Sequence, residues 1–159
     1  MSVIYRKGTK TDVPELLACI KELARYEKAE DQVEVNEAEL LRDGFGPNPI
    51  YEFLVAELDL KIIGIALYYY KYSTWKGKAL FLEDLIVKEE YRRTGAGTHL
   101  FIEVCKIAHK QKCRRMDWQV LDWNTPAIEF YRKFEAKLDP EWLDGRLFKN
   151  DLERISGLI

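Results

Sequence analysis

The sequence has no long apolar run and no excess of positive charge, and its number of cysteines is odd. No stretch approaches the roughly 18 apolar residues of a membrane-spanning helix, and the first residues lack the apolar region of a signal peptide. Its 25 basic and 27 acidic residues leave a net charge of −2, which argues against a general nucleic-acid binder. The three cysteines fit a reducing compartment. These absences predict a cytoplasmic protein with neither membrane nor nucleic acid as a partner.

The sequence also has no internal repeat, low-complexity tract or linker. With 159 residues, 47% of them hydrophobic, it can bury one good core but not two. We therefore expect residues 1–159 to form a single domain.

What the chain does contain is a glycine-rich turn, residues 91–100, between a strand-like and a helix-like segment. Residues 80–87 are β-type, and an apolar stripe with helical spacing follows the turn: Leu100, Phe101, Val104, Ile107 and Ala108. Gly95 and Gly97 therefore lie at a helix N-terminus, where unpaired amides and the helix dipole favour a phosphate. Arg92 and Arg93 add positive charge suited to a pyrophosphate.

Other phosphate loops match this turn less well. No Gly-Lys-Ser or Gly-Lys-Thr is present, and Leu100 stands where a dinucleotide fingerprint has its third glycine. An ordinary surface turn before an amphipathic helix remains the alternative.

Cys105, His109 and Cys113 follow one another at helical spacing and could form a metal site. They supply three ligands without an obvious fourth, and Cys113 is expected beyond the helix end. We predict ordinary packed cysteines and no metal.

The order of predicted elements indicates a mixed α/β fold. Strands are expected at 3–7, 51–57, 61–72, 78–87, 114–120 and 146–149, and helices at 13–26, at 37–43, after the glycine-rich turn and from 124. The residues of 78–87 are apolar on both faces, which predicts a central strand covered by helices on each side.

This order of elements, together with the pattern Arg92-x-x-Gly95-x-Gly97, resembles the GNAT superfamily of N-acetyltransferases. The resemblance implies an α/β (α+β) fold with a central mixed, largely antiparallel sheet of about six to seven strands and helices on both faces. It also implies acetyl-CoA as co-substrate and a homodimer. The residues implied to bind acetyl-CoA are Leu85, Ile86 and Val87 along pantetheine, Arg92, Arg93, Thr94, Gly95, Ala96, Gly97 and Thr98 at the pyrophosphate, and Asn124, Thr125, Pro126 and Ala127 from the other side.

Several local strings resemble one subfamily, the spermidine/spermine acetyltransferases. The strings 73–77 (Ser-Thr-Trp-Lys-Gly) and 121–124 (Leu-Asp-Trp-Asn) are more similar to its thialysine N-epsilon-acetyltransferase branch than to its polyamine branch. The resemblance implies acetyl transfer to a primary amine of a small cationic substrate, thialysine or a related diamino acid. A polyamine acetyltransferase is the alternative enzyme, and an acetyl-CoA-binding sensor or scaffold is the alternative outside enzymes.

Acetylation of an alkylamine, with a pKa of about 10.4, requires a base or a site that favours the neutral amine. Glu83 alternates with Phe81, Leu85 and Val87 along a core-like strand, so we expect a buried carboxyl with a raised pKa. It also matches the subfamily residue that contacts the amine and is thought to deprotonate it, directly or through water, so Glu83 is the candidate catalytic base. The alternative is a structural acid paired with a buried base.

Tyr131 matches the tyrosine that serves the family as general acid for the departing thiolate. A packed core tyrosine is the alternative. Glu135 stands where relatives commonly have a helix-ending glycine, and a left-handed backbone there would cost about 1 kcal/mol.

Charge is segregated along the chain. Residues 27–39 are acidic, whereas residues 88–115 hold eight basic and three acidic residues. A cationic amine and anionic CoA would occupy opposite ends of such a site. The residues expected to contact the amine are Tyr26, Glu27, Glu30, Trp75, Glu83, Asp117, Trp118 and Gln119. A solvated helix face is the alternative for the acidic residues.

Overall fold

The computed structural model describes residues 2–159, which form two compact units, one up to Gln119 and the other from Val120. The first unit holds the sheet, and we describe each unit by itself. Whether residues 1–159 act as a single domain stays a prediction.

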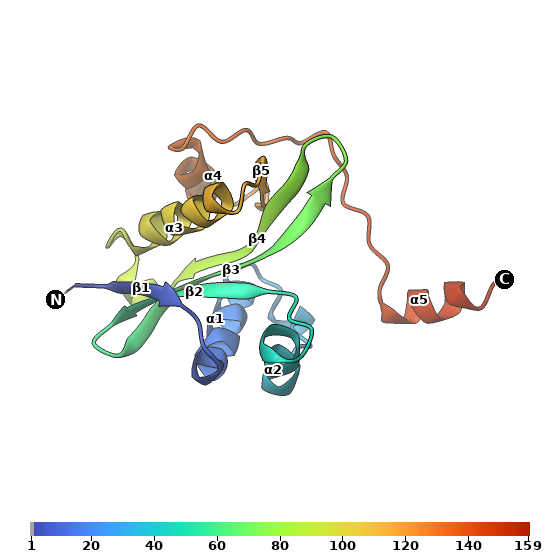
Figure 1. The fold of residues 1–159 in the computed structure, drawn as a ribbon, viewed down its shortest axis with the longest axis horizontal. Coiled ribbons are helices and arrows are strands. Elements are labelled where there is room, and N and C mark those ends of the chain that lie inside the picture. Colours follow the sequence, from blue (N-terminus) through green and yellow to red (C-terminus); the bar gives the residue numbers. More distant parts are fainter. Residues whose placement is uncertain (1) are drawn as a thin grey trace. The chain divides into compact units, whose positions relative to one another are not determined.

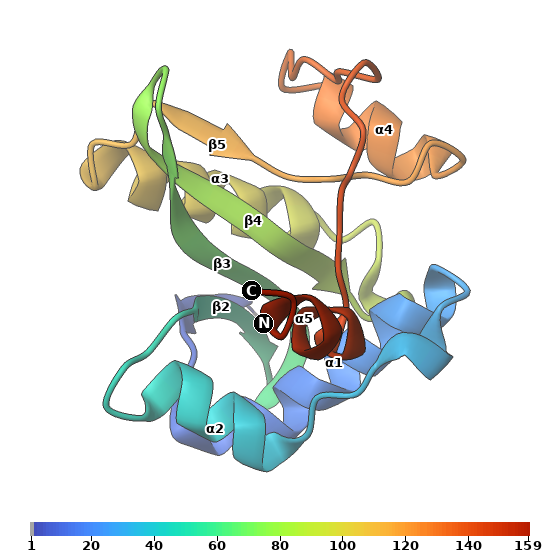
Figure 2. The same cartoon turned by 90° about the vertical axis from the view of Figure 1, so that its right-hand side faces the viewer.

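The sheet of the first unit is mixed, as predicted. It contains β1 (Ile4–Lys7), β2 (Glu52–Leu58), β3 (Lys61–Ser73), β4 (Gly77–Val87) and β5 (Arg115–Asp117) in that spatial order. The first three pairs are antiparallel, and β5 lies parallel to β4 (Figure 2). The residues at the β2–β3 turn, Asp59 and Leu60, both have positive φ angles (50° and 63°). This is the backbone of a tight hairpin.

Two expectations about strands were wrong. The described residues contain five strands rather than six to seven, and residues 146–149 form no strand but lead into α5 (Lys149–Ser156). The strand expected at 114–120 is only three residues long. Short apolar segments satisfy a strand pattern in sequence, but a strand also needs a hydrogen-bonding partner, which the pattern does not reveal.

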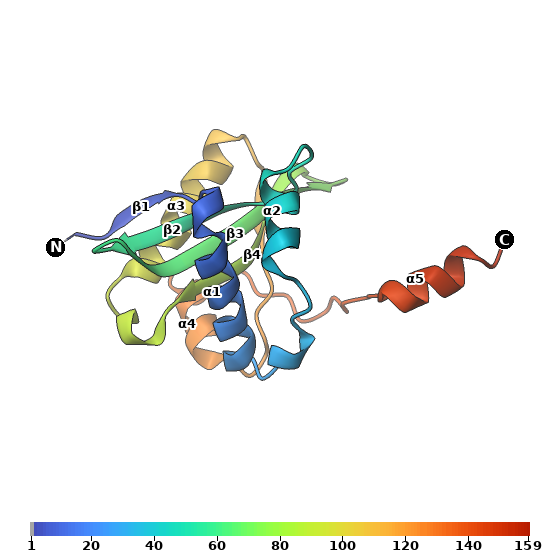
Figure 3. The same ribbon diagram turned by 90° about the horizontal axis from the view of Figure 1, so that it is seen from below.

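Helices cover both faces of this sheet (Figures 1 and 3). On one face α1 (Val13–Tyr26) and α2 (Glu37–Phe45) pack on a core contributed by both helices and the central strands: Val13, Leu16, Cys19, Leu40, Phe53, Val55, Ile62, Ile65, Leu67 and Ile86. On the other face α3 (Ala96–Lys110) buries Leu100, Phe101, Val104 and Ala108. The buried face of α3 follows the predicted apolar stripe, of which only Ile107 is half-buried.

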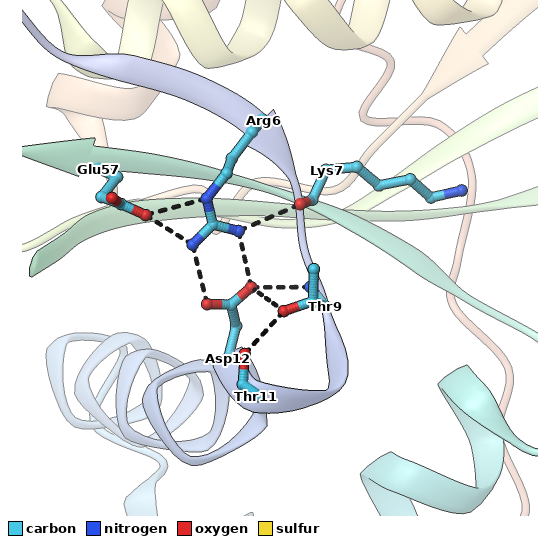
Figure 4. A network of polar contacts seen from close by, with 6 residues as sticks. All are labelled: Arg6, Lys7, Thr9, Thr11, Asp12 and Glu57. Atoms are coloured by element: carbon cyan, nitrogen blue, oxygen red, sulfur yellow. Dashed lines mark hydrogen bonds and ion pairs between the residues drawn. The ribbon is translucent and has the colours of Figure 1, made fainter. Parts of the chain in front are cut away.

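A polar network fixes the start of α1 against the sheet (Figure 4). Arg6 of β1 donates two hydrogen bonds to Asp12, at 2.8 and 3.0 Å, and its Nε donates to Glu57 of β2 at 2.9 Å. The Arg6 guanidinium holds the pKa of the buried Asp12 carboxyl near 2. Because each partner is hydrogen-bonded, the carboxylate stays charged in its buried position.

Three helices end in the same way without glycine. Lys28 after α1, Lys112 after α3 and Glu135 after α4 (Thr125–Arg132) have left-handed φ angles of 61°, 60° and 58°. After α3, the amides of Lys112 and Cys113 bond to the carbonyls of His109 and Ala108, which is a Schellman motif. The left-handed conformation considered for Glu135 is therefore confirmed.

Candidate active site

The centre of the candidate site is a bulge in β4. Leu67 of β3 lies opposite Asp84 and the next residue, Tyr68, lies opposite Leu82, so Glu83 is the extra residue. The bulge interrupts the two-residue alternation on which the burial of Glu83 was predicted. Glu83 is in fact exposed, and the prediction that it is buried was wrong.

Asp84 is the desolvated carboxyl of this strand. Its partner Leu67 belongs to the core beneath α1 and α2, so Asp84 faces that side of the sheet. Burial raises the pKa of Asp84 to about 7, and the nearby negative charges of Glu83 and Glu27 add to the effect. Sequence analysis missed Asp84 because strict alternation assigned its side chain to the opposite face from Glu83.

Glu27, Glu83 and Asp84, which we call the acidic group, come together from the end of α1 and from β4. Glu27 is half-buried, and desolvation raises its pKa. The negative charges of Glu27 and Glu83 both act on Asp84, and a group of acids of this kind attracts a cation. Of the residues expected to contact the amine, Glu27 and Glu83 therefore both lie near Asp84.

Other residues expected at the amine have different neighbours. Glu30 is exposed and forms a two-point ion pair with Arg25, at 2.8 and 3.0 Å. The Tyr26 ring lies under the Arg92 guanidinium, 5.2 Å from its centroid. Tyr26 therefore joins the end of α1 to the glycine-rich turn.

Trp75 lies in a different segment from Trp118 and Gln119, which directly follow β5. Trp75 lies in the β3–β4 turn and is 81% exposed. Trp118 packs edge-on against Phe101 of α3, with 5.6 Å between ring centroids, and Gln119 is exposed. That these three residues contact an amine stays a prediction.

Tyr69 of β3 links the acidic group to an aromatic surface. Its hydroxyl donates a hydrogen bond to Glu83 Oε2 at 2.9 Å, and its ring stacks on Phe81 at 5.4 Å. Sequence analysis did not select Tyr69, because a tyrosine in a run of three gives no signal of its own.

The glycine-rich turn has the geometry of an anion cradle. Gly95, with φ of 91°, is the N-cap of α3, and no side chain caps the first amides of the helix. The first turn carries no acid. A Cβ added at Gly95 would meet nothing within 4 Å, and one at Gly97 would lie 3.5 Å from Val87 Cγ2. The first amides of α3 therefore have no helical or side-chain partner, and Gly97 and Thr98 are at least partly exposed to a phosphate.

Side chains brace the same turn. Arg92 Nε donates to the carbonyl of Val87 at 3.1 Å, and Thr94 Oγ1 donates to the carbonyl of Tyr91 at 2.7 Å. Arg93 adopts a left-handed φ of 64°. The two arginines place their charge next to the α3 N-terminus.

The edge of β4 beside this turn lacks a strand partner. Pairing with β5 covers only Ala79, Leu80 and Phe81, whereas β4 continues to Val87. Within residues 2–159, Leu85, Ile86 and Val87 therefore have no strand beside them on the β5 side. Their backbone groups on that side can bond an extended ligand.

In the second unit, Asn124 caps α4 by accepting a hydrogen bond from the Ala127 amide at 3.3 Å. Thr125 and Pro126 form the first helical positions. Tyr131 is buried, at 8% exposure, and packs edge-on against Phe130. Asn124 and Tyr131 thus have clear structural contacts within this unit, and their functional roles stay predictions.

The described residues contain no group of three or more His, Cys, Asp or Glu side chains that could hold a metal ion. Cys105 is exposed on α3, so the prediction of a packed cysteine was wrong at this position. Cys113 lies beyond the helix end, as expected, and is half-buried. Over residues 2–159, no helix is both long enough and apolar enough to cross a membrane.

The uncapped, glycine-rich start of α3 and the carboxyls at the β4 bulge define a site suited to an anionic cofactor and a cationic substrate. The chain matches the acetyltransferase (GNAT) family over residues 15–135 and belongs to that family. It is an N-acetyltransferase by this membership.

The chain is also similar to individual proteins. The chain is 40% identical over 143 residues to a thialysine N-epsilon-acetyltransferase of Bos taurus, covering 85% of this chain and 84% of that protein. It is 39% identical over 133 residues to a spermidine/spermine N(1)-acetyltransferase-like protein 1 of Homo sapiens, of which it covers 19%. An integron cassette protein from the mobile metagenome of V. cholerae has the same fold, with a TM-score of 0.81 and 26% identity over 99% of both chains.

Family membership implies acetyl-CoA as co-substrate, and the residues present fit it. The open space at Gly95 and Gly97, the uncapped α3 amides and the flanking arginines suit a pyrophosphate. The unpaired edge of β4 suits the amide groups of a pantetheine arm.

Proposed function

We propose that this protein transfers an acetyl group from acetyl-CoA to a primary amine of a small cationic substrate, thialysine or a related diamino acid. The observation that carries the proposal is the acidic group at the β4 bulge, on the strand that leads into the glycine-rich turn. Its carboxylates suit a cationic amine, and the turn suits an anionic cofactor.

In this proposal Glu83 and Asp84 have two different roles toward the amine. Glu83, oriented by the Tyr69 hydroxyl, binds the substrate ammonium. Asp84 accepts the proton, since its pKa of about 7 lies closer to that of an alkylamine than an ordinary carboxyl's does. The negative charge of Glu83 adds to the raised pKa of Asp84, so a substitution of Glu83 should change the pH profile.

The chain's remaining residues bind and orient. When bound, acetyl-CoA supplies the activated thioester. We assign its pyrophosphate to Arg92, Arg93 and the amides of residues 94–98, and its pantetheine arm to the edge at Leu85, Ile86 and Val87. The assignment of residues 124–127 to acetyl-CoA rests on the resemblance to the family alone. Tyr131 donates the proton that the departing thiolate needs; its match to the family's tyrosine supports this role.

The test is steady-state kinetics with acetyl-CoA and a panel of thialysine, lysine, ornithine, spermidine and spermine. We expect the highest kcat/KM for thialysine or another diamino acid, because Ser73 and Thr74 stand where polyamine enzymes commonly carry Asp-Pro. A clear preference for spermidine would instead make the protein a polyamine acetyltransferase. Binding of acetyl-CoA without turnover of any amine would indicate a sensor.

We also propose a homodimer, which the resemblance to the family supports. Sedimentation velocity at micromolar concentration measures it directly. A species of 18.7 kDa under these conditions would contradict the dimer.

A further inference from the structure

A second charged cluster lies near the acidic group, on β3 and β5. Lys71 Nζ is 2.8 Å and Arg115 Nε is 2.9 Å from the same oxygen, Asp117 Oδ2. We call Lys71, Arg115 and Asp117 the basic cluster, because two cations face one carboxylate. The three side chains are 38%, 38% and 25% exposed, so their unused hydrogen-bonding groups are accessible to a ligand.

An aromatic surface connects the basic cluster to the acidic group. Lys71 Nζ lies 5.1 Å from the centroid of the Phe81 ring, and Tyr69 stacks on that same ring. Lys71 follows Tyr69 by two residues on β3, so both side chains share one face and lie about 7 Å apart along the strand. Phe81 is also the register partner of Asp117.

The two ends of this surface carry opposite net charge. At one end the Tyr69 hydroxyl bonds Glu83 of the acidic group, and at the other the basic cluster has one excess positive charge. A ligand that complements both ends has an ammonium at one end and a carboxylate at the other. An amino acid with an aminoalkyl side chain meets this description, whereas a polyamine places a second cation against Lys71.

We propose that the basic cluster binds the α-carboxylate of the acceptor through Lys71 and Arg115, while Asp117 accepts from its α-ammonium. The cluster thereby selects diamino acids over diamines of the same length. This inference rests on the proposed function, because it requires the reacting amine to lie at the acidic group.

The experiment compares each diamino acid with the diamine that lacks only its carboxylate: lysine with cadaverine, and ornithine with putrescine. For the parent protein we expect kcat/KM to favour the amino acid of each pair. Lys71→Met should lower kcat/KM for the amino acid about 10- to 100-fold, the usual effect of losing a charge-assisted hydrogen bond, and leave the diamine within about twofold.

Two variants complete the design. Lys71→Arg keeps the charge and should retain the amino-acid preference. Lys76→Met removes an exposed lysine from the adjacent turn and should leave the ratio of the two kcat/KM values unchanged. Because the measured quantity is a ratio between two substrates of one preparation, a fraction of misfolded protein does not alter it.

An unchanged ratio in Lys71→Met would show that the cluster is a structural ion pair and overturn the inference. An equal loss on both substrates would overturn it as well. The proposed function is tested separately by the parent protein: it fails if the parent acetylates neither diamino acids nor diamines, whereas the inference alone fails if the parent acetylates both without preference.

Discussion

Asp84 and Glu83 are neighbours in sequence, yet the bulge gives their carboxyls different surroundings. Asp84 faces the covered side of the sheet beside Glu27, and Glu83 is exposed and bonded to Tyr69. A carboxyl that is neutral near pH 7 in the folded chain lowers stability when it is forced to ionise. The Asp84 carboxyl can therefore serve as a base in catalysis and also lower the stability of the folded chain.

This cost leads to a prediction for Asp84→Asn. The pKa of Asp84 is about 7 in the folded chain and 3.8 as the ordinary value, so between these pH values the folded chain holds a proton that the unfolded chain has lost. Stability therefore falls as pH rises from about 4 to 7, by at most about 4 kcal/mol. The free energy of unfolding of Asp84→Asn minus that of the parent should therefore be more positive at pH 8 than at pH 4. Urea unfolding at the two pH values measures this difference. An identical difference at both pH values would contradict the assignment.

Tyr131 is tested by removing only its hydroxyl. Tyr131→Phe should lower kcat by roughly 10²-fold if thiolate protonation limits the rate, while acetyl-CoA affinity stays within a few fold. Calorimetry and thiol release on the same sample separate binding from turnover. Tyr72→Phe, at a 77% exposed position, is the matched control. Near-parental kcat across pH 6 to 9 would make Tyr131 a packing residue.

At the scale of elements, the glycine-rich turn combines backbone freedom with an open helix start. A Cβ at Gly97 makes only ordinary contact with Val87, so a larger residue there is compatible with the fold. Gly97→Val should therefore fold but lose acetyl-CoA binding, because its methyl groups would occupy the space of the pyrophosphate. Calorimetry measures the loss, and Gly145→Val, at an open position, is the control. Parental affinity in Gly97→Val would place the phosphate elsewhere.

The ends of α3 and α4 offer a stability prediction. Lys112 and Glu135 hold left-handed φ angles that favour glycine. Replacing either by glycine should raise the free energy of unfolding by about 0.5–1 kcal/mol, since the relief of strain exceeds the entropy added to the unfolded chain. Lys110→Gly, in the last helical position of α3, should instead destabilise by up to about 1 kcal/mol. Chemical denaturation measures all three, and loss of stability in both αL variants would contradict this account.

At the scale of the whole molecule, the sequence predicts the architecture but not the details of the site. Apolar periodicity identified α1, α3 and the three long strands, because their burial repeats over many residues. The bulge at Glu83 left no trace in that periodicity, so the wrong carboxyl was expected to be buried. The ion pair of Asp117 with Lys71 joins two strands distant in sequence, and no local pattern reveals such a partner. The resemblance to relatives predicted the acetyl-transfer reaction, which apolar periodicity alone could not predict.

The measurement that tests the central claim most directly is the pH dependence of kcat with saturating thialysine in three proteins. The parent should lose activity as pH falls through about 7, where Asp84 takes up its proton. Glu83→Gln removes a negative neighbour of Asp84, so the acidic limb should move to lower pH. Asp84→Asn should lower kcat by roughly 10²-fold and abolish this limb. A parental acidic limb retained in Asp84→Asn would contradict the account, because the proton would then be taken by another group.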